Sequence, residues 1–160
     1  MKKYLFILLI IPLLAGCQNE VRDNAEFNLG NISLSAFENN TKYFVVTPFE
    51  WEGEDGTTLK SIHIVNSQGE NLSAEKGISA TFYIGDSFKK TGVYVREDIG
   101  DKEKVNGYKL TEEQTLIMET SLASVKDDSA KNLKFIYETN GEEYEKVVEW
   151  NTLSTLRTND

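Results

Sequence analysis

The sequence predicts an all-β protein, a single immunoglobulin-like β-sandwich of about eight short strands. Three observations lead to this prediction. Apolar and polar residues alternate with a period of two in several short segments, which is the pattern of a strand with one buried face. Turn-forming residues separate these segments, and helical periodicity is weak throughout the chain. The cysteine–tryptophan–cysteine spacing of true immunoglobulin domains is absent from the sequence, so the prediction concerns architecture and not family.

The expected strands follow one another along most of the chain. The alternation is clear at residues 78–84, where Ile78, Ala80, Phe82 and Ile84 fall on one side. Residues 42–49 are β-branched and aromatic, a composition typical of strands. The full set of expected strands is 31–37, 42–49, 58–66, 78–84, 93–95, 116–122, 133–137 and 144–150.

The last two strands form a predicted hairpin. Asn140-Gly141 suits a two-residue type I′ turn, in which both residues have a positive φ. The resulting register pairs Tyr137 with Tyr144 and Leu133 with Val148. The same register gathers the apolar residues on one face, so the turn and the face agree. These residues are Leu133, Phe135, Tyr137, Tyr144, Val148 and Trp150.

Residues 111–118 have a second interpretation. Thr111 followed by Gln114 at the third position is the pattern of a helix capping box. We favour a loop that enters a strand, because Leu116, Met118 and Leu122 continue at a period of two.

The first 17 residues carry an export signal. Two lysines are followed by the apolar run from Tyr4 to Leu14, which is too short to cross a bilayer. The run ends in Leu14-Ala15-Gly16-Cys17, which resembles the lipobox of bacterial lipoproteins. The resemblance implies that the Cys17 thiol receives a diacylglyceryl group and that the peptide is cut just before it. The alternative is an ordinary signal peptide cleaved near Ala15-Gly16.

These features predict four segments and a location. The segments are a lipoprotein signal peptide at 1–16, a lipidated cysteine and polar tether at 17–28, the β-sandwich at 29–153 and a C-terminal tail at 154–160. We expect the lipid to hold the protein on the extracytoplasmic face of a bacterial membrane. Gln18, and not aspartate, follows the cysteine, which resembles the pattern of outer-membrane sorting in a two-membrane cell. In a one-membrane cell the location would be the plasma membrane.

Charge and cysteine content restrict the partners. The chain has 17 basic and 26 acidic residues; without Lys2 and Lys3, which leave with the signal, 15 and 26 remain, a net charge of −11. This charge disfavours nucleic acid and tight contact with anionic lipid headgroups. Cys17 is the only cysteine, so no internal disulfide can form. Lipidation accounts for the single thiol in an exported protein.

The chain lacks a complete set of catalytic residues, and we expect neither an enzyme nor a cofactor. His63 is the only histidine, so a hydrolase would have to combine it with a serine such as Ser87, which follows Gly85-Asp86 as in the GDSL esterases. Those enzymes carry their histidine near the C-terminus, where this chain has none. A second alternative is a small ligand- or calcium-binding module that uses the acidic loops at 50–56 and 97–101, although neither has EF-hand spacing.

The favoured hypothesis is a non-enzymatic, membrane-tethered binding module with an unknown protein or cell-envelope partner. The candidate partner site is Phe49, Glu50, Trp51 and Glu52, in the connection between two expected strands. We expect Pro48 to limit the strand before it and Gly53 to allow a tight loop. Trp51 has two interpretations. It closes the end of the core, as most tryptophans in small domains do, or it stays partly exposed as a contact residue.

Overall fold

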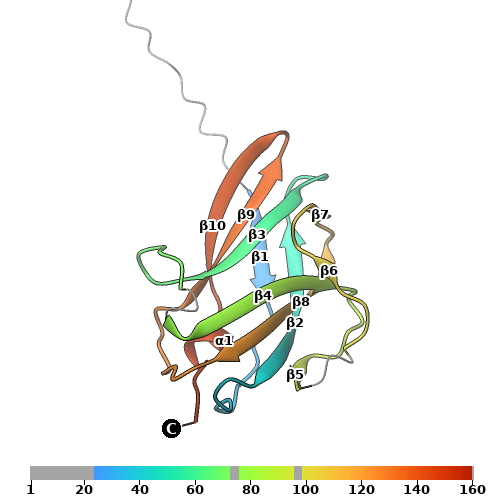
Figure 1. The fold of residues 1–160 in the computed structure, drawn as a ribbon. Coiled ribbons are helices and arrows are strands. Elements are labelled where there is room, and N and C mark those ends of the chain that lie inside the picture. Colours follow the sequence, from blue (N-terminus) through green and yellow to red (C-terminus); the bar gives the residue numbers. More distant parts are fainter. Residues whose placement is uncertain (1–23, 73–75, 96–98, 160) are drawn as a thin grey trace, which may run out of the picture.

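The computed structural model describes residues 24–72, 76–95 and 99–159, which form two antiparallel β-sheets (Figure 1). The six-stranded sheet has the order β1-β2-β8-β4-β6, with β5 also paired to β2, and the four-stranded sheet has the order β10-β9-β3-β7. The elements are β1 (Glu26–Leu29), β2 (Lys42–Glu52), β3 (Thr58–Val65), β4 (Ile78–Gly85), β5 (Gly92–Tyr94), β6 (Glu103–Lys104), β7 (Tyr108–Lys109), β8 (Glu113–Leu122), β9 (Asn132–Thr139), β10 (Glu142–Glu149) and α1 (Asn151–Ser154).

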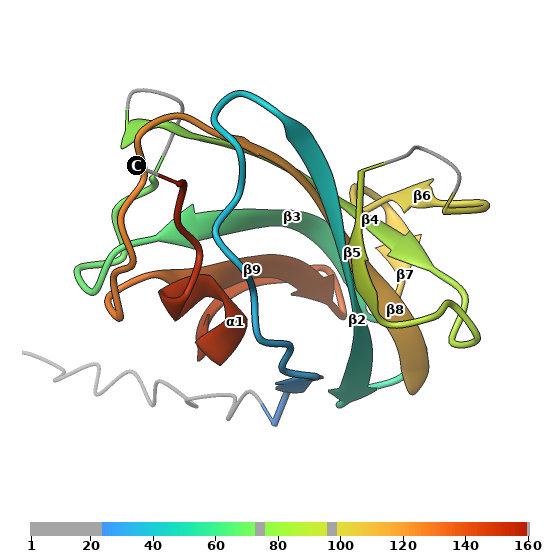
Figure 2. The same cartoon turned by 90° about the horizontal axis from the view of Figure 1, so that it is seen from below.

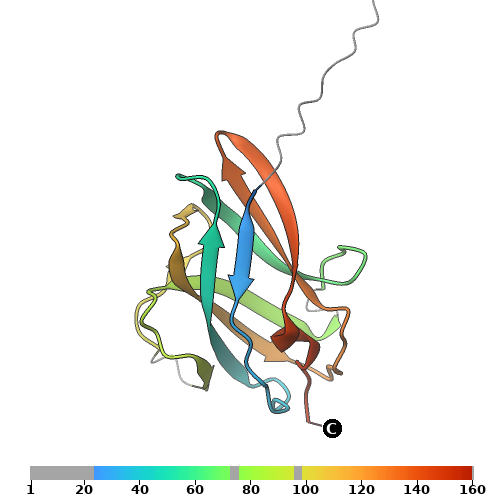
Figure 3. The ribbon, with the colours of Figure 1, turned by 180° about the vertical axis from the view of Figure 1, so that it is seen from behind.

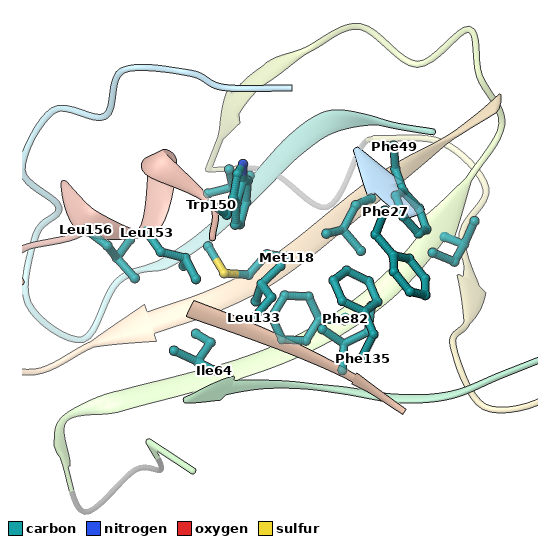
Figure 4. Packing of buried hydrophobic residues seen from close by; sticks show 14 of the residues in the cluster. Phe27, Phe49, Ile64, Phe82, Met118, Leu133, Phe135, Trp150, Leu153 and Leu156 are labelled. Atoms are coloured by element: carbon teal, nitrogen blue, oxygen red, sulfur yellow. The ribbon is translucent and has the colours of Figure 1, made fainter. Parts of the chain in front are cut away.

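The two sheets lie face to face around one main hydrophobic core (Figure 2). Aromatic rings connect them: the ring centroid of Phe135 on β9 lies 4.3 Å from that of Phe27 on β1 and 5.6 Å from that of Phe49 on β2. Phe82 of β4 and Met118 of β8 extend this layer toward Trp150 (Figure 4). The core therefore draws on both sheets, as the all-β prediction requires.

The predicted hairpin is confirmed in its register and turn. Tyr137 pairs with Tyr144 and Leu133 pairs with Val148. Asn140 has a φ of 54° and Gly141 a φ of 82°, so both turn residues adopt the left-handed conformation that a type I′ turn requires.

Seven of the eight expected strands coincide with strands of the structure, and 31–37 does not. That segment runs as a loop in which only Phe37 forms an isolated bridge, to Thr158. A side chain replaces part of the missing sheet ladder: Thr152 Oγ1 accepts from Ile32 N at 3.0 Å and donates to Ile32 O at 3.2 Å. Backbone groups satisfied in this way need no strand partner.

The domain also extends beyond the predicted boundaries of 29–153. At the N-terminal side, β1 pairs with β2, and both Phe27 of β1 and Ala25 just before it are buried, so the end of the supposed tether belongs to the domain. β1 lies between β2 and β10 (Figure 3), and Lys146 of β10 donates a hydrogen bond to Ala25 O. The prediction was wrong here because a four-residue strand among polar residues has too little periodicity to be distinguished from a tether.

At the other side, the supposed tail at 154–160 packs into the domain, with Leu156 and Thr158 buried. Lys131, only 4% exposed, donates from Nζ to Lys126 O at 2.7 Å and to Leu156 O at 3.1 Å. Burial lowers the pKa of Lys131, against the opposing effect of Asp128. The lysine thus holds the chain end against the loop before β9.

The central strands β2 and β8 are buried on both faces. Their outer face carries a second apolar cluster of Phe44, Val46 and Ile117, covered by Tyr83, Tyr94 and Ile99. Lys102 Nζ lies 4.7 Å from the centroid of the Phe44 ring, in cation–π geometry. This second layer explains why residues 42–49 read as a continuous apolar segment and not as an alternating one.

Substitution of Trp51 tests the core. Trp51 is 6% exposed and its ring lies 5.0 Å from that of Phe27, so we expect Trp51→Ala to lower the free energy of unfolding by roughly 3–5 kcal/mol. Phe88, which is 95% exposed, is the matched control, and Phe88→Ala should change the free energy by no more than about 0.5 kcal/mol. Urea unfolding of unlipidated residues 18–160 measures both. Equal losses in the two variants would contradict the packing described here.

Candidate functional site

An open hollow of about 570 Å³ lies at the end of the domain where β2 ends and β8 begins. Its walls come from two segments that are far apart in the sequence. Glu50 pairs with Glu113 across β2 and β8, and Trp51 N donates to Glu112 O at 3.0 Å, which joins the two walls. The lining residues are Glu50, Trp51, Glu52, Gly53, Asp55, Leu110, Thr111, Glu112 and Glu113.

The hollow contains most of the predicted partner site, but not in the expected form. β2 continues through Pro48 to Glu52, so the expectation that Pro48 limits the strand was wrong. Gly30 N donates to Pro48 O, so the backbone of Pro48 faces the β1 side of β2 and not β8. The last residue of β1 is Leu29, which pairs with Phe49, so no residue of β1 needs an N–H from Pro48. No rung of the β8 ladder is lost, and this is the position in which a strand tolerates proline.

Strand alternation then decides which side chains face solvent. Phe49 and Trp51 are buried, and the Trp51 ring lies 6.0 Å from that of Tyr137 on β9. Glu50 and Glu52 alternate with them and are exposed. Trp51 therefore closes the end of the core, as the first interpretation proposed, and Glu50 and Glu52 are the members of the predicted site that face solvent.

Hydrogen bonds connect the turns around the hollow. Thr57 Oγ1 lies 2.8 Å from Thr139 Oγ1, and Thr57 O accepts from Leu110 N at 3.0 Å. Asn140, at the tip of the β9–β10 hairpin, donates from its side chain to the Glu54 carboxylate. These hydrogen bonds link three separate connections at the rim of the hollow.

The walls carry five carboxylates: Glu50, Glu52, Asp55, Glu112 and Glu113. Across residues 24–72, 76–95 and 99–159, no lysine or arginine forms an ion pair with any of them. Nor does that part of the chain hold three or more acidic, histidine or cysteine side chains placed to bind a metal ion. The hollow is therefore a negatively charged surface without metal-site geometry, and the calcium alternative gains no support from it.

The half of the wall formed by residues 110–113 was not predicted as part of a site. The signal that it carried, Thr111 with Gln114, was assigned to helix capping. Gln114 Oε1 does accept from Thr111 N, at 3.2 Å, but it does so at the start of β8. Gln114 is 3% exposed, and its Nε2 has no hydrogen-bond partner among the residues that the structure describes.

The two residues of the hydrolase alternative lie apart. His63 on β3 lines a separate hollow beside the Ile78–Phe82 half of β4, whereas Ser87 follows the other end of that strand. His63 Nε2 instead lies 2.9 Å from Ser61 Oγ. Burial, and then the charge of Lys134, lowers the pKa of His63. The structure gives Ser87 no histidine as a base.

The part of the chain that the structure describes contains no helix that is long and apolar enough to cross a membrane. Cys17 and the lipobox residues Leu14, Ala15 and Gly16 lie outside the described residues. No curated protein and no solved structure matches the chain. Residues 1–18 match the family model for the prokaryotic membrane lipoprotein lipid attachment site, which identifies a bacterial lipoprotein signal, and no family is found for the rest of the chain.

Proposed function

We propose that this protein is a non-enzymatic binding module, held on the extracytoplasmic face of a bacterial membrane by the lipid on Cys17. The observation that carries the proposal is the position of the acidic hollow relative to the anchor. β1 begins opposite the end of β2, because Glu26 pairs with Glu52, and Glu52 lines the hollow. The hollow therefore lies at the end of the domain to which the tether is joined.

The length of the tether limits where the partner can be. Seven peptide units separate Cys17 from Asn24, the first described residue, and seven extended residues span at most about 25 Å. A partner that fills the hollow must therefore come close to the membrane surface. The unpaired carboxylates favour cationic groups on that partner, which is a protein or a component of the cell envelope.

The proposal includes the fold type, an immunoglobulin-like sandwich. Constant-type immunoglobulin domains contain the sheets A-B-E-D and C-F-G. When β1, β2, β3, β4, β8, β9 and β10 are lettered A to G in chain order, the two sheets have the orders A-B-E-D and G-F-C. The strands β5, β6 and β7 are then additions between D and E. This agreement in strand order supports the assignment.

Cys17→Ser tests the anchor. With the lipidated thiol removed, we expect the protein to leave the membrane fraction, since a single covalent lipid group provides the attachment. Cell fractionation followed by a high-salt wash measures this. A variant that still sediments with membranes after the wash would contradict the lipid anchor.

In-cell photo-crosslinking tests the hollow. A photoreactive amino acid at Glu52 or Glu113 should give the same discrete crosslinked species, whereas one at Glu149, an exposed glutamate of β10 outside the hollow, should not. The double variant Glu50→Gln, Glu112→Gln should reduce the yield from Glu52 at least about fivefold, because close charge pairs across an interface contribute roughly 1 kcal/mol or more. Equal crosslinking from all three positions would remove the hollow as the partner site. So would a crosslinking yield from Glu52 that is the same in the double variant as in the unsubstituted protein.

A further inference from the structure

One edge of the six-stranded sheet is only partly covered. β4 pairs with β8 along its whole length, from Ile78 to Gly85. On its other side, β6 pairs only with Tyr83 and Ile84. In the described part of the chain, residues 78–82 thus have a neighbouring strand on one side and none on the other.

Two hydrogen bonds show which backbone groups face this open edge. Gly77 O accepts from Ala123 N at 2.8 Å, and Ser79 O accepts from Thr120 Oγ1 at 3.0 Å, so both carbonyls point toward β8. Backbone groups alternate in direction along a strand. The N–H and C=O groups of Ile78, Ala80 and Phe82 consequently point away from β8, toward the open edge. These three residues together offer free N–H and C=O groups with which an added strand can form a backbone ladder.

This edge also lacks the usual protection against pairing. Natural edge strands carry charged residues, proline or bulges, or they are very short. β10 has five charged residues among eight, and β1 has only four residues. Residues 77–85, with the sequence GISATFYIG, contain no charge and no proline, and Ser79 and Thr81 are exposed.

A hollow of about 290 Å³ with a mixed polar and apolar lining lies beside the open edge, between β4 and β3. Its apolar lining comes from Ile62 and Ile64 of β3, Leu72 of the following loop, and Ile78, Ala80 and Phe82 of β4. His63, Asn71 and Ser79 add polar groups to the same lining. The neighbouring edge of β3 already accepts a short segment, since Leu72 N donates to Ile64 O at 2.7 Å and Asn71 forms a bridge with Val65. In strand addition, the backbone ladder supplies affinity and pockets of this kind receive alternate side chains.

We propose that the free edge of β4 at residues 78–82 is a second binding surface, which takes an extended, uncharged segment of a partner protein by strand addition. Side chains at alternate positions of that segment would be uncharged and enter the hollow between β3 and β4. The absence of charge along the edge matches a neutral segment. This surface is distinct from the acidic hollow, and its recognition depends on the backbone.

A second copy of this chain fits the edge less well. In a symmetric dimer, two β4 strands would pair antiparallel around a two-fold axis normal to the sheet. Every strand of one copy would then run opposite to the same strand of the other copy. The two β1 strands would then begin at opposite ends of the pair, although both chains are anchored to a membrane by short tethers. A single extended segment of another protein avoids this conflict.

The test uses the mature chain and the capped peptide KTVSVTVSK, which is extended and uncharged between its terminal lysines. Isothermal titration should detect saturable binding. The same peptide with N-methyl groups on alternate residues of the pairing face, which cannot form the ladder, should bind at least tenfold more weakly. Ala80→Pro removes an N–H that faces the open edge and not β8, so it should weaken the unmodified peptide at least tenfold while circular dichroism stays unchanged.

Val147→Lys, at an exposed position of β10, is the control and should leave peptide binding unchanged. If Ala80→Pro does not fold, the comparison of the unmodified and N-methylated peptides is sufficient to test the proposal, because it uses the unsubstituted protein. No measurable binding to the folded chain, or equal binding of the two peptides, would overturn the proposal. Loss of binding on Glu52→Gln would also overturn it, because it would place the peptide in the acidic hollow.

Discussion

The contact of Phe27 and Phe49 with Phe135 joins the two sheets, and the other features of the molecule depend on it. Phe27 and Phe49 belong to β1 and β2, and Phe135 belongs to β9 on the opposite sheet. The single cysteine lies at position 17, so packing has to do what disulfides do in many exported domains. The aromatic layer also holds β1 in the sheet.

The position of β1 links the anchor to the chemistry of the surface. β1 starts beside the end of β2, and the turns that extend from this end carry the unpaired carboxylates. The start of β1 and the acidic hollow thus share one end of the domain, whereas the C-terminus lies at the other end (Figure 1). Negative charge at this end of the domain also opposes close contact with anionic headgroups.

The two proposed surfaces differ in physical character. The acidic hollow presents side-chain charge on a braced rim, and its contribution to binding should weaken with salt. The β4 edge presents backbone groups without charge, and its contribution should be nearly independent of salt. A lipoprotein with both surfaces can select one partner by charge and hold an extended segment of a partner by its backbone.

Local patterns were sufficient for much of the fold. The type I′ turn at Asn140-Gly141 and the alternation around it predicted the register of β9 and β10, because both strands and their turn lie within 18 residues. Alternation also located β4 and β8. The sequence pattern at 31–37 was misleading, since Ile32 and Leu34 alternate as in a strand, while Thr152, 120 residues away, satisfies the backbone of Ile32.

The sequence by itself determined the lipid attachment signal, the all-β class and the last hairpin, because each depends on neighbouring residues alone. It also pointed to residues 49–52 as a candidate site. Only the tertiary structure decided that Trp51 turns inward while Glu50 and Glu52 face solvent, that residues 110–113 complete the hollow, and that one side of β4 stays open. These outcomes depend on which strands become neighbours, and that is settled by packing between segments that lie far apart in the chain.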